Sequence, residues 1–549
     1  MVSLLYRLDG LVLIRTRRIA VIHRIAGTTS MQTSFQDVDA CPAHVDGVLT
    51  LAQGRIQGSR AGGSLQFLGI PYGSPTNGAL RFRPPIAAPA WDGMRDCRAY
   101  GDACPQVNDD LPAWQFDGAH SADCLNLNVW MPADAAPGDR LPVMVWLHGG
   151  AYLSGTANLP LYDGRMLADE QQVVVVSINH RLNAFGYLYL DDRNDFAANT
   201  ANLGQQDIVL ALEWIAANSA AFGGDPDNVT LFGESGGGGK ICALTTMPSA
   251  AGLFHKVVIQ SGAFVATLSR QQARERADAF LSLLGADACA LVDLPDTRIL
   301  AATRQLIERY GYTAFWPVDD GVVIDASSGQ RTAVPMMIGT TRHEAAYFLE
   351  PRQLEQGPLC WSDHRRALER GLGPFSLGPD DATQAAAAAV STHAHEDAPG
   401  TIGRDLTDIL FWIPAVTLAE RNGRHADTFM YRFDWEFACC GGRYSIHGAE
   451  IPFVFGTLDY SLPAWDPVDF PNTRYAADAG DERFALAARM RRAWADFARL
   501  GDPAVRGALA WPRYTPDARS TRIFDRVCRI EDDPDAARRR AWRAEHAGA

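Results

Sequence analysis

Two kinds of hydrophobic pattern alternate along the chain from about residue 45 onward. The segments 141–150 (LPVMVWLHGG) and 173–182 (VVVVSINHRL) contain continuous apolar, β-branched runs that stop abruptly. Strands buried on both faces of a mostly parallel sheet have this pattern. Residues 207–222 instead place an apolar side chain at roughly every third or fourth position, which predicts a helix with one buried face.

Further strands are predicted before and after these segments. Residues 47–58 alternate as in an early hairpin, and short apolar runs follow at 229–232, 256–262, 335–341 and 428–435. Strands that alternate with helices in this order are typical of a doubly wound α/β fold built on a mostly parallel sheet.

The chain has 549 residues, no internal repeat and no long linker, so we expect one large domain over residues 41–531. Residues 532–549 are expected to form a C-terminal tail, as a solvated helix or frayed end. Residues 1–40 are expected to be a basic N-terminal extension outside the fold. Arginines interrupt the apolar stretches there, so the segment lacks the core of a secretory signal; a basic amphipathic anchor is the alternative.

The net charge of −14 narrows the range of partners. An acidic chain is poorly suited to nucleic acid or to an anionic membrane surface, and no apolar run approaches the roughly 18 residues that span a bilayer. The ten cysteines have no CxxC spacing, which argues against a zinc site or a redox pair. We therefore expect a cytoplasmic protein without stable membrane anchoring; a periplasmic or secreted protein exported by an unrecognised route is the alternative.

The glycine-rich segment 232–240 (FGESGGGGK) carries the strongest chemical signal. A phosphate-binding loop would need a glycine at Glu234 and a hydroxyl residue at Ile241, and a flexible linker would not lie between a buried strand and an apolar helix. The segment fits a third pattern, G-x-S-x-G between a strand and a helix, which is the nucleophile elbow. This pattern predicts Ser235 as a nucleophile at the N-terminus of a helix.

A serine nucleophile needs donors for the negative charge that develops on the substrate oxygen. The segment HGGAY (148–152) follows a predicted strand and offers the backbone N–H groups of Gly150 and Ala151. Together with the N–H of Gly236 they predict a three-donor oxyanion hole. A plain tight turn after the strand is the alternative.

Several long motifs in a fixed order resemble the type-B carboxylesterase/lipase family of α/β-hydrolases. They are FGESGGG and HGGAY, SADCLNLNVW (121–130), NHRLNAFGYL (179–188), the stretch 202–235 and HGAEIPFVFG (447–456). The resemblance covers about residues 45 to 528. It implies an α/β-hydrolase fold, with a central mostly parallel sheet flanked by helices and with large insertions that form a gorge.

The resemblance also implies a Ser-Glu-His triad in that chain order. The acid falls on Glu344, although the family's flanking Asp and Gly are here His343 and Ala345. The base falls on His447, after the predicted strand at 428–435. His343 is a rival base, but it is adjacent to the acid in sequence and so poorly placed to be oriented by it.

Other side chains are expected around the triad. Ser261, Glu234 and Glu450 are expected to support it, and Trp114, Phe315 and Trp316 are expected to line the substrate pocket. Trp114 has the spacing at which cholinesterases place a cation-binding tryptophan, and an apolar wall is the alternative. Cys104 and Cys124 match a disulfide of secreted family members, and we expect them to be reduced here.

These residues predict a serine carboxylesterase that hydrolyses small-molecule esters through an acyl-enzyme, with no metal and no organic cofactor. A specialised hydrolase of lipids, carbamates or amides is the nearest alternative. A non-catalytic interaction protein of the same fold is the other, although such relatives lose triad residues. The acyl and alcohol specificity and the oligomeric state are left open by the sequence.

Overall fold

The computed structural model describes residues 6–8, 11–13, 47–107, 118–191, 199–326, 332–348, 401–439, 442–458, 481–504 and 510–544. Contacts divide the chain into two units, Met1–Val45 and Asp46–Ala549. In the first unit, β1 (Tyr6–Leu8) pairs antiparallel with β2 (Leu11–Leu13). The domain limits proposed from the sequence, 41–531 with flanking segments, stay a prediction.

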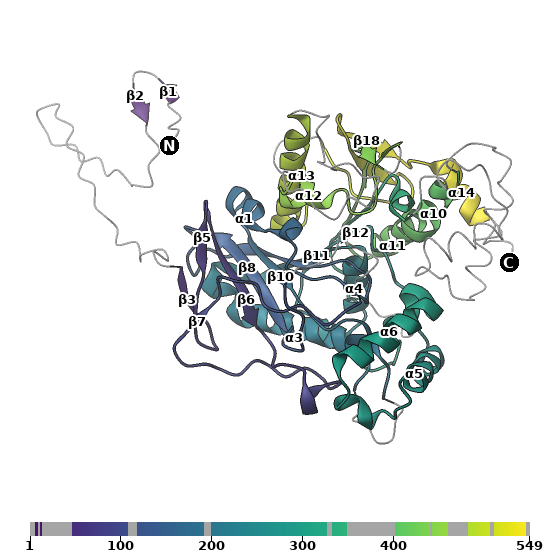
Figure 1. Cartoon of the computed structure of the whole chain (residues 1–549). Coiled ribbons are helices and arrows are strands. Elements are labelled where there is room, and N and C mark those ends of the chain that lie inside the picture. Colours follow the sequence, from purple (N-terminus) through teal and green to yellow (C-terminus); the bar gives the residue numbers. More distant parts are fainter. Residues whose placement is uncertain are drawn as a thin grey trace, which may run out of the picture. The chain divides into compact units, whose positions relative to one another are not determined.

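An 11-stranded sheet forms the centre of the second unit (Figure 1). Its six inner pairings, from β10 through β9, β11, β12, β13 and β14 to β17, are all parallel, and antiparallel pairs close both ends. In spatial order the strands are β18 (Arg529–Asp532), β17 (Ser520–Phe524), β14 (Thr428–Phe433), β13 (Met336–Thr341), β12 (Lys256–Gln260), β11 (Gly224–Glu234), β9 (Leu141–Leu147), β10 (Val174–Ile178), β8 (Asn126–Pro132), β6 (Ser64–Pro71) and β5 (Ser59–Ala61).

Helices cover both faces of this sheet, as Figure 1 shows for α3 on one side and α1, α12 and α13 on the other. The α-helices of the second unit within the described ranges are α1 (Arg165–Gln171), α2 (Asn183–Tyr187), α3 (Leu203–Asn218), α4 (Gly236–Leu244), α5 (Arg270–Leu284), α6 (Asp296–Tyr310), α10 (Thr401–Thr407), α11 (Ile413–Asn422), α12 (Ile451–Phe455), α13 (Glu482–Leu500) and α14 (Ala536–Ala544). Small sheets are formed by β3 (Val48–Thr50), β4 (Arg55–Gln57) and β7 (Met94–Asp96), and by β15 (Phe437–Cys439) with β16 (Gly442–Tyr444).

Each central strand supplies side chains to two separate hydrophobic cores. In β9, Val143, Val145 and Leu147 belong to one core, and Met144 and Trp146 belong to the other. This alternation follows from the two-residue period of a strand, and it explains why the sequence of β9 is apolar throughout. A central strand of this kind is stable only when helices bury both of its faces.

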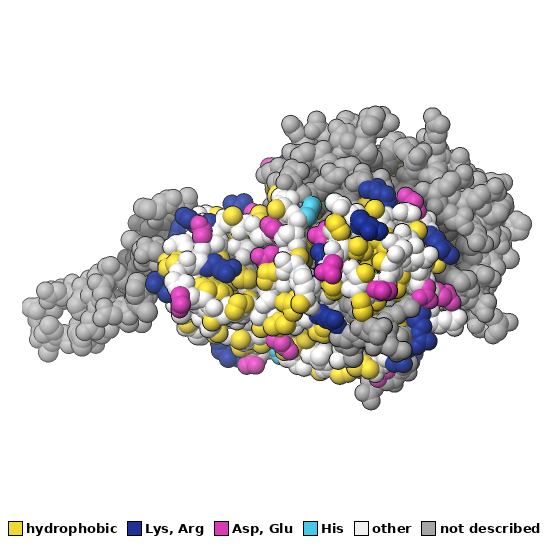
Figure 2. Space-filling view, turned by 60° about the horizontal axis from the view of Figure 1, so that its bottom comes forward, with side chains coloured by type: hydrophobic (Ala, Val, Ile, Leu, Met, Phe, Trp, Pro, Cys, Tyr) yellow, Lys and Arg dark blue, Asp and Glu magenta, His cyan; other side chains and the backbone are white. Residues whose placement is uncertain are grey.

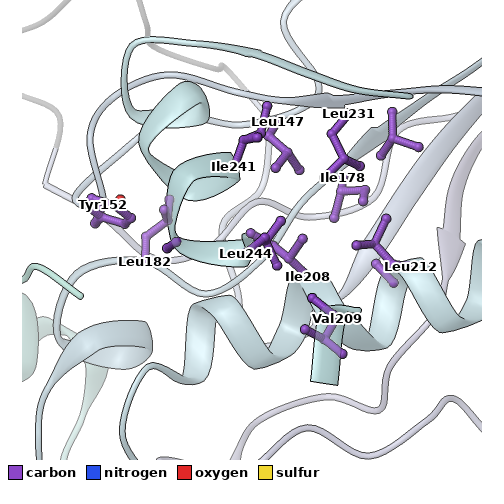
Figure 3. Close-up of a cluster of buried hydrophobic side chains, with 14 of the residues drawn as sticks. Leu147, Tyr152, Ile178, Leu182, Ile208, Val209, Leu212, Leu231, Ile241 and Leu244 are labelled. Atoms are coloured by element: carbon purple, nitrogen blue, oxygen red, sulfur yellow. The ribbon is translucent and has the colours of Figure 1, made fainter. Parts of the chain in front are cut away.

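The first core holds helix α4 against the sheet. Figure 3 shows Ile241 and Leu244 of α4 close to Leu147, Leu231 and Ile208, which come from two strands and from α3. All five side chains are buried. This packing therefore holds the N-terminus of α4 in a fixed position at the carboxyl end of β11.

The predicted parallel sheet with flanking helices is confirmed, and the predicted strands are present, with two differences in extent. Helix α3 starts at Leu203, four residues before the predicted start at 207. Its first turn is polar, but Gln205 is buried there and its Nε2 donates to the carbonyl of Lys240 (3.3 Å). Strand β11 starts at Gly224 because a register shift after Gly224 extends its pairing with β9 beyond the apolar run.

The C-terminal segment also has defined structure. Residues 532–544 contain the end of β18 and helix α14, and Arg538 of α14 pairs with the buried Asp408. Cys104 and Cys124 are both buried free thiols.

The surface seen in Figure 2 mixes acidic, basic and apolar side chains, with no large area of a single charge on that face. Among the helices of the described ranges, none is long and apolar enough to cross a membrane.

Candidate active site

The predicted nucleophile lies in a strained turn between β11 and α4. Ser235 has φ 53° and ψ −122°, a backbone conformation that non-glycine residues rarely adopt. The N–H of Ser235 donates to the carbonyl of Gln260 (2.8 Å), and the carbonyl of Ser235 accepts a hydrogen bond from the N–H of Gly239 (3.1 Å). These two hydrogen bonds hold the turn in place. The side chain of Ser235 therefore projects from a fixed point at the carboxyl edge of the sheet.

A glycine is required two residues after Ser235 for this turn to pack. A Cβ atom at Gly237 would overlap the carbonyl oxygen of Leu147 and lie 2.8 Å from its carbonyl carbon. Both of these atoms belong to the backbone of β9, so they cannot move aside as a side chain could. The G-x-S-x-G pattern thus reflects the close approach of α4 to the strand beside β11.

The three predicted oxyanion donors lie side by side. A Cβ atom at Gly236 would be 2.5 Å from the backbone nitrogen of Ala151, so the first turn of α4 touches the loop after β9. Gly150 and Ala151 have φ values of 83° and 53°, which turns the loop sharply at this point. Their N–H groups and that of Gly236 donate no hydrogen bond to another described residue. They are therefore available to a ligand oxygen.

The predicted acid and base are in direct contact. Oε2 of Glu344 lies 2.6 Å from Nδ1 of His447, and both side chains are buried. The N–H of Thr341 donates to the other carboxylate oxygen of Glu344 (2.7 Å), which fixes the orientation of the acid. A carboxylate on Nδ1 holds the proton there and leaves Nε2 to act as a base.

His343 faces another environment. Its Nδ1 accepts a hydrogen bond from the N–H of Ser445 (3.1 Å), and its ring packs against Tyr444. Burial, together with nearby arginines, lowers the pKa of His343 to about 4, so that it is neutral. No described carboxylate is hydrogen-bonded to its ring, in contrast to His447.

The nucleophile and the base are not hydrogen-bonded to each other within the described residues. Nε2 of His447 lies 3.1 Å from Oε1 of Glu234, the residue that precedes Ser235. The imidazole of His447 therefore contacts the carboxylate of Glu234, which belongs to the elbow, and not the hydroxyl of Ser235. Catalytic hydrogen bonds commonly shorten or form only when substrate is bound, so the absence of this hydrogen bond does not argue against His447 as the base.

Three buried glutamates surround His447, and each has a different set of partners. Glu344 binds the imidazole, as described above. Glu450 accepts hydrogen bonds from Gln260 Nε2 (3.2 Å) and from Tyr431 Oη (3.4 Å). Glu234 accepts no hydrogen bond from a described residue.

The environment raises the pKa values of Glu234, Glu450 and His447. Burial raises the pKa of Glu234 to about 8 and that of Glu450 to about 7. Burial alone would lower the pKa of His447, but the carboxylates of Glu234 and Glu344 outweigh it and raise the pKa to about 9. The site therefore retains protons near neutral pH that exposed carboxyl groups would have lost.

The remaining predicted residues are distributed as follows. Ser261, after β12, is buried and its hydroxyl has no hydrogen-bond partner among the described residues. Phe315 packs against Phe280 in the core, with ring centroids 5.9 Å apart, while Trp316 faces Tyr152 (4.7 Å). Trp114 lies outside the described residues.

Aromatic side chains that no sequence motif indicated cover the imidazole. The ring centroids of Phe411 and Phe348 lie 4.9 and 5.1 Å from that of His447. Phe264 lies 6.0 Å from Phe411 and 6.0 Å from Trp316, so the rings form a continuous apolar wall. No group of three or more His, Cys, Asp or Glu side chains within the described ranges is arranged to hold a metal ion.

Known proteins resemble this chain over most of its length. The model of the carboxylesterase family matches residues 45–542. The para-nitrobenzyl esterase of Bacillus subtilis is 36% identical over 507 residues, which cover 90% of this chain and 97% of that protein. The liver carboxylesterase of Sus scrofa is 31% identical over 516 residues, covering 85% and 87% of the two chains.

Solved structures give the same result for the fold. The structure of a thermophilic para-nitrobenzyl esterase superposes with a TM-score of 0.78 at 34% identity, covering 90% of this chain and all of that one. The α/β-hydrolase fold predicted from the motifs is thereby confirmed. The predicted gorge stays a prediction.

Proposed function

The chain belongs to the carboxylesterase family and is a carboxylic ester hydrolase, and we propose that it works as a serine esterase with Ser235, Glu344 and His447 as its triad. The observation that carries this proposal is the 2.6 Å contact between Glu344 and His447, in an imidazole whose other nitrogen lies 3.1 Å from Oε1 of Glu234, the residue before Ser235. Each of the three residues follows a strand of the same parallel sheet, at the edge where α/β proteins bind ligands.

The first half of the proposed reaction forms an acyl-enzyme. His447 Nε2 takes the hydroxyl proton of Ser235 while the oxygen attacks the ester carbonyl. The positive charge that develops on the imidazole is stabilised by the buried carboxylate of Glu344 on the opposite nitrogen. His447 then gives its proton to the departing alcohol.

The negative charge of the tetrahedral intermediate falls on the former carbonyl oxygen. The N–H groups of Gly150, Ala151 and Gly236 are free of described partners and adjacent to each other, so they are suited to receive it. The N-terminus of α4 adds a favourable dipole at the same point. In the second half of the reaction, water repeats these steps on the acyl-enzyme and releases the acid.

The apolar wall of Phe264, Phe348, Phe411 and Trp316 suits uncharged esters with an aromatic or aliphatic group. Para-nitrobenzyl and p-nitrophenyl esters are therefore the first substrates to test.

A phosphonate ester inhibitor tests the proposed nucleophile directly. We expect one equivalent of leaving group per chain, loss of ester hydrolysis in proportion to labelling, and a mass increase confined to the peptide that contains Ser235. Hydrolysis that persists in fully labelled protein, or labelling at another serine, would contradict the triad.

The raised pKa of His447 leads to a prediction for the pH dependence. The base must be neutral to accept a proton, and its pKa is raised from 6.5 to about 9, so kcat/KM is expected to rise with pH up to about pH 9 and to level off above it. Glu234→Gln removes the carboxylate nearest Nε2, and we expect the rise to move to lower pH by about one unit. The measurement is kcat/KM for p-nitrophenyl acetate from pH 5 to 10. An unchanged profile in Glu234→Gln would show that this carboxylate does not act on the base.

A further inference from the structure

Helix α4 contains a lysine that the mechanism above does not use. Lys240 follows the four glycines of the elbow, and its side chain is fully buried. Only two of the 50 Lys and Arg residues of the chain are lysines, Lys240 and Lys256. A buried ammonium group is costly unless hydrogen bonds and an opposite charge compensate for lost hydration. The partners of Lys240 therefore indicate its role.

Its ammonium group is bound to the oxyanion loop, which is the segment 148–152 that carries the oxyanion donors Gly150 and Ala151. Nζ of Lys240 donates to the carbonyl of His148 (2.8 Å), and it lies 5.8 Å from the centre of the Tyr152 ring. His148 is the first residue after β9, and Gly150 and Ala151 follow it two and three residues later. The hydrogen bond thus joins α4, which begins directly after Ser235, to the start of this loop.

The charged and titratable groups around Lys240 come from three strands. Glu234 ends β11, His148 follows β9, and His180 follows β10 with its ring stacked on that of His148 at 5.0 Å. Burial lowers the pKa of both histidines well below 6.5, so they are neutral at pH 7. Burial also lowers the pKa of Lys240, and the carboxylate of Glu234 acts in the opposite direction. The charge of Glu234 therefore favours the ammonium form of Lys240.

The same carboxylate links Lys240 to the proposed base, because Oε1 of Glu234 lies 3.1 Å from Nε2 of His447. A charge on Lys240 favours the ionised form of Glu234, and ionised Glu234 favours the protonated form of His447. A change at Lys240 is thus transmitted to the base without direct contact.

We propose that Lys240 is a positioning residue of this active site, whose ammonium group holds the oxyanion loop at His148 and balances the charge of Glu234 beside His447. This inference rests on the proposed serine-esterase function, and it adds a residue that acts through two others rather than on the substrate.

The first test separates positioning from substrate binding. In Lys240→Met, kcat for p-nitrophenyl acetate is expected to fall about 10- to 100-fold, with KM changed less than about twofold. The reason is that a displaced oxyanion loop stabilises the transition state less but leaves substrate binding unchanged. Affinity for a trifluoromethyl ketone, which forms a tetrahedral adduct, should fall by the same factor. Lys240→Gln retains a donor for the His148 carbonyl and should recover part of the loss. Lys256→Met, the matched control, should behave as wild type.

The second test follows the charge. Both Lys240→Met and Lys240→Gln should move the rise of kcat/KM to lower pH, since without the positive charge of Lys240 the pKa of Glu234 rises and its carboxylate raises the pKa of His447 less. In a Glu234→Gln background the same substitutions should cause no further shift. Wild-type kcat and an unmoved pH profile in folded Lys240→Met would overturn the inference, as would an effect on KM alone. If Lys240→Met does not fold, the pH profile of Lys240→Gln decides.

A third measurement leaves Lys240 itself unchanged. Because the chain has two lysines, Cε-labelled lysine gives two side-chain NMR signals, and a Lys256→Arg variant assigns them. We expect the pKa of Lys240 to lie below its ordinary value of 10.5, and to be lower still in Glu234→Gln. A Lys240 titration that is unchanged in Glu234→Gln would overturn the inference, because the two groups would then not be coupled.

The outcomes also separate this inference from the proposed function. A wild type that hydrolyses no ester, or one that remains active when Ser235 is replaced, contradicts the triad. An active wild type that requires Ser235 but tolerates Lys240→Met contradicts only the role of Lys240.

Discussion

Replacing Ser235 by alanine is expected to lower kcat/KM for p-nitrophenyl acetate by about 10⁵- to 10⁶-fold, which is the loss when a triad nucleophile is removed. The hydroxyl is the only part of the side chain that the substitution deletes. The backbone of the elbow is held by the carbonyl of Gln260 and the N–H of Gly239, so the turn should keep its shape. The oxyanion donors should then account for the small remaining rate.

Ser219→Ala is the matched control, because Ser219 is also buried and its hydroxyl has no hydrogen-bond partner among the described residues. It should leave kcat/KM unchanged. Equal rates in wild type and Ser235→Ala, with both proteins folded by circular dichroism, would contradict Ser235 as nucleophile.

Glu344→Gln has the second largest expected effect, a loss of about 10³- to 10⁴-fold in kcat. The amide is nearly the same size as the carboxylate, but it can donate to Nδ1 of His447 and so stabilise the tautomer that has its proton on Nε2. That tautomer cannot accept the proton of Ser235. The amide also lacks the charge that stabilises the imidazolium form.

In Glu344→Gln, His447 no longer has this carboxylate beside it. The loss in kcat should therefore be greatest at the pH values at which wild type depends on a correctly oriented neutral imidazole. Full rate profiles between pH 5 and 10 measure this. Glu420→Gln serves as control, since Glu420 is buried and paired with Arg519 (3.0 Å) away from the triad. A kcat within about tenfold of wild type in Glu344→Gln would assign the acid to another residue.

The parts of this site that depend on local sequence could be predicted. Ser235 lies in a pattern that needs glycine where α4 meets β9, and Glu344 and His447 follow strands whose carboxyl ends must share one edge of the sheet. For each of these residues, the adjacent sequence indicates where in the fold the side chain lies. The contact between Glu344 and His447 agrees with the expectation, and their roles stay proposals until the variants are measured.

The parts that depend on contacts across space could not. Phe315 and Trp316 are neighbours in sequence, yet the first packs into the core against Phe280 and the second faces Tyr152. Phe411 covers His447 from a segment that carries no motif. Periodicity cannot distinguish a core aromatic from one beside an imidazole, because both are buried.

The order of the strands has a consequence for the synthesis of the protein. A nascent chain that ends before Met336 already contains Ser235 and the loop after β9, but it lacks β13 and β14, whose ends lead to the acid and the base. The nucleophile is therefore present on the ribosome well before it can be activated. Ester hydrolysis should consequently appear only after β13, β14 and the segments that follow them have docked, which makes activity a reporter of the folding of this part of the chain.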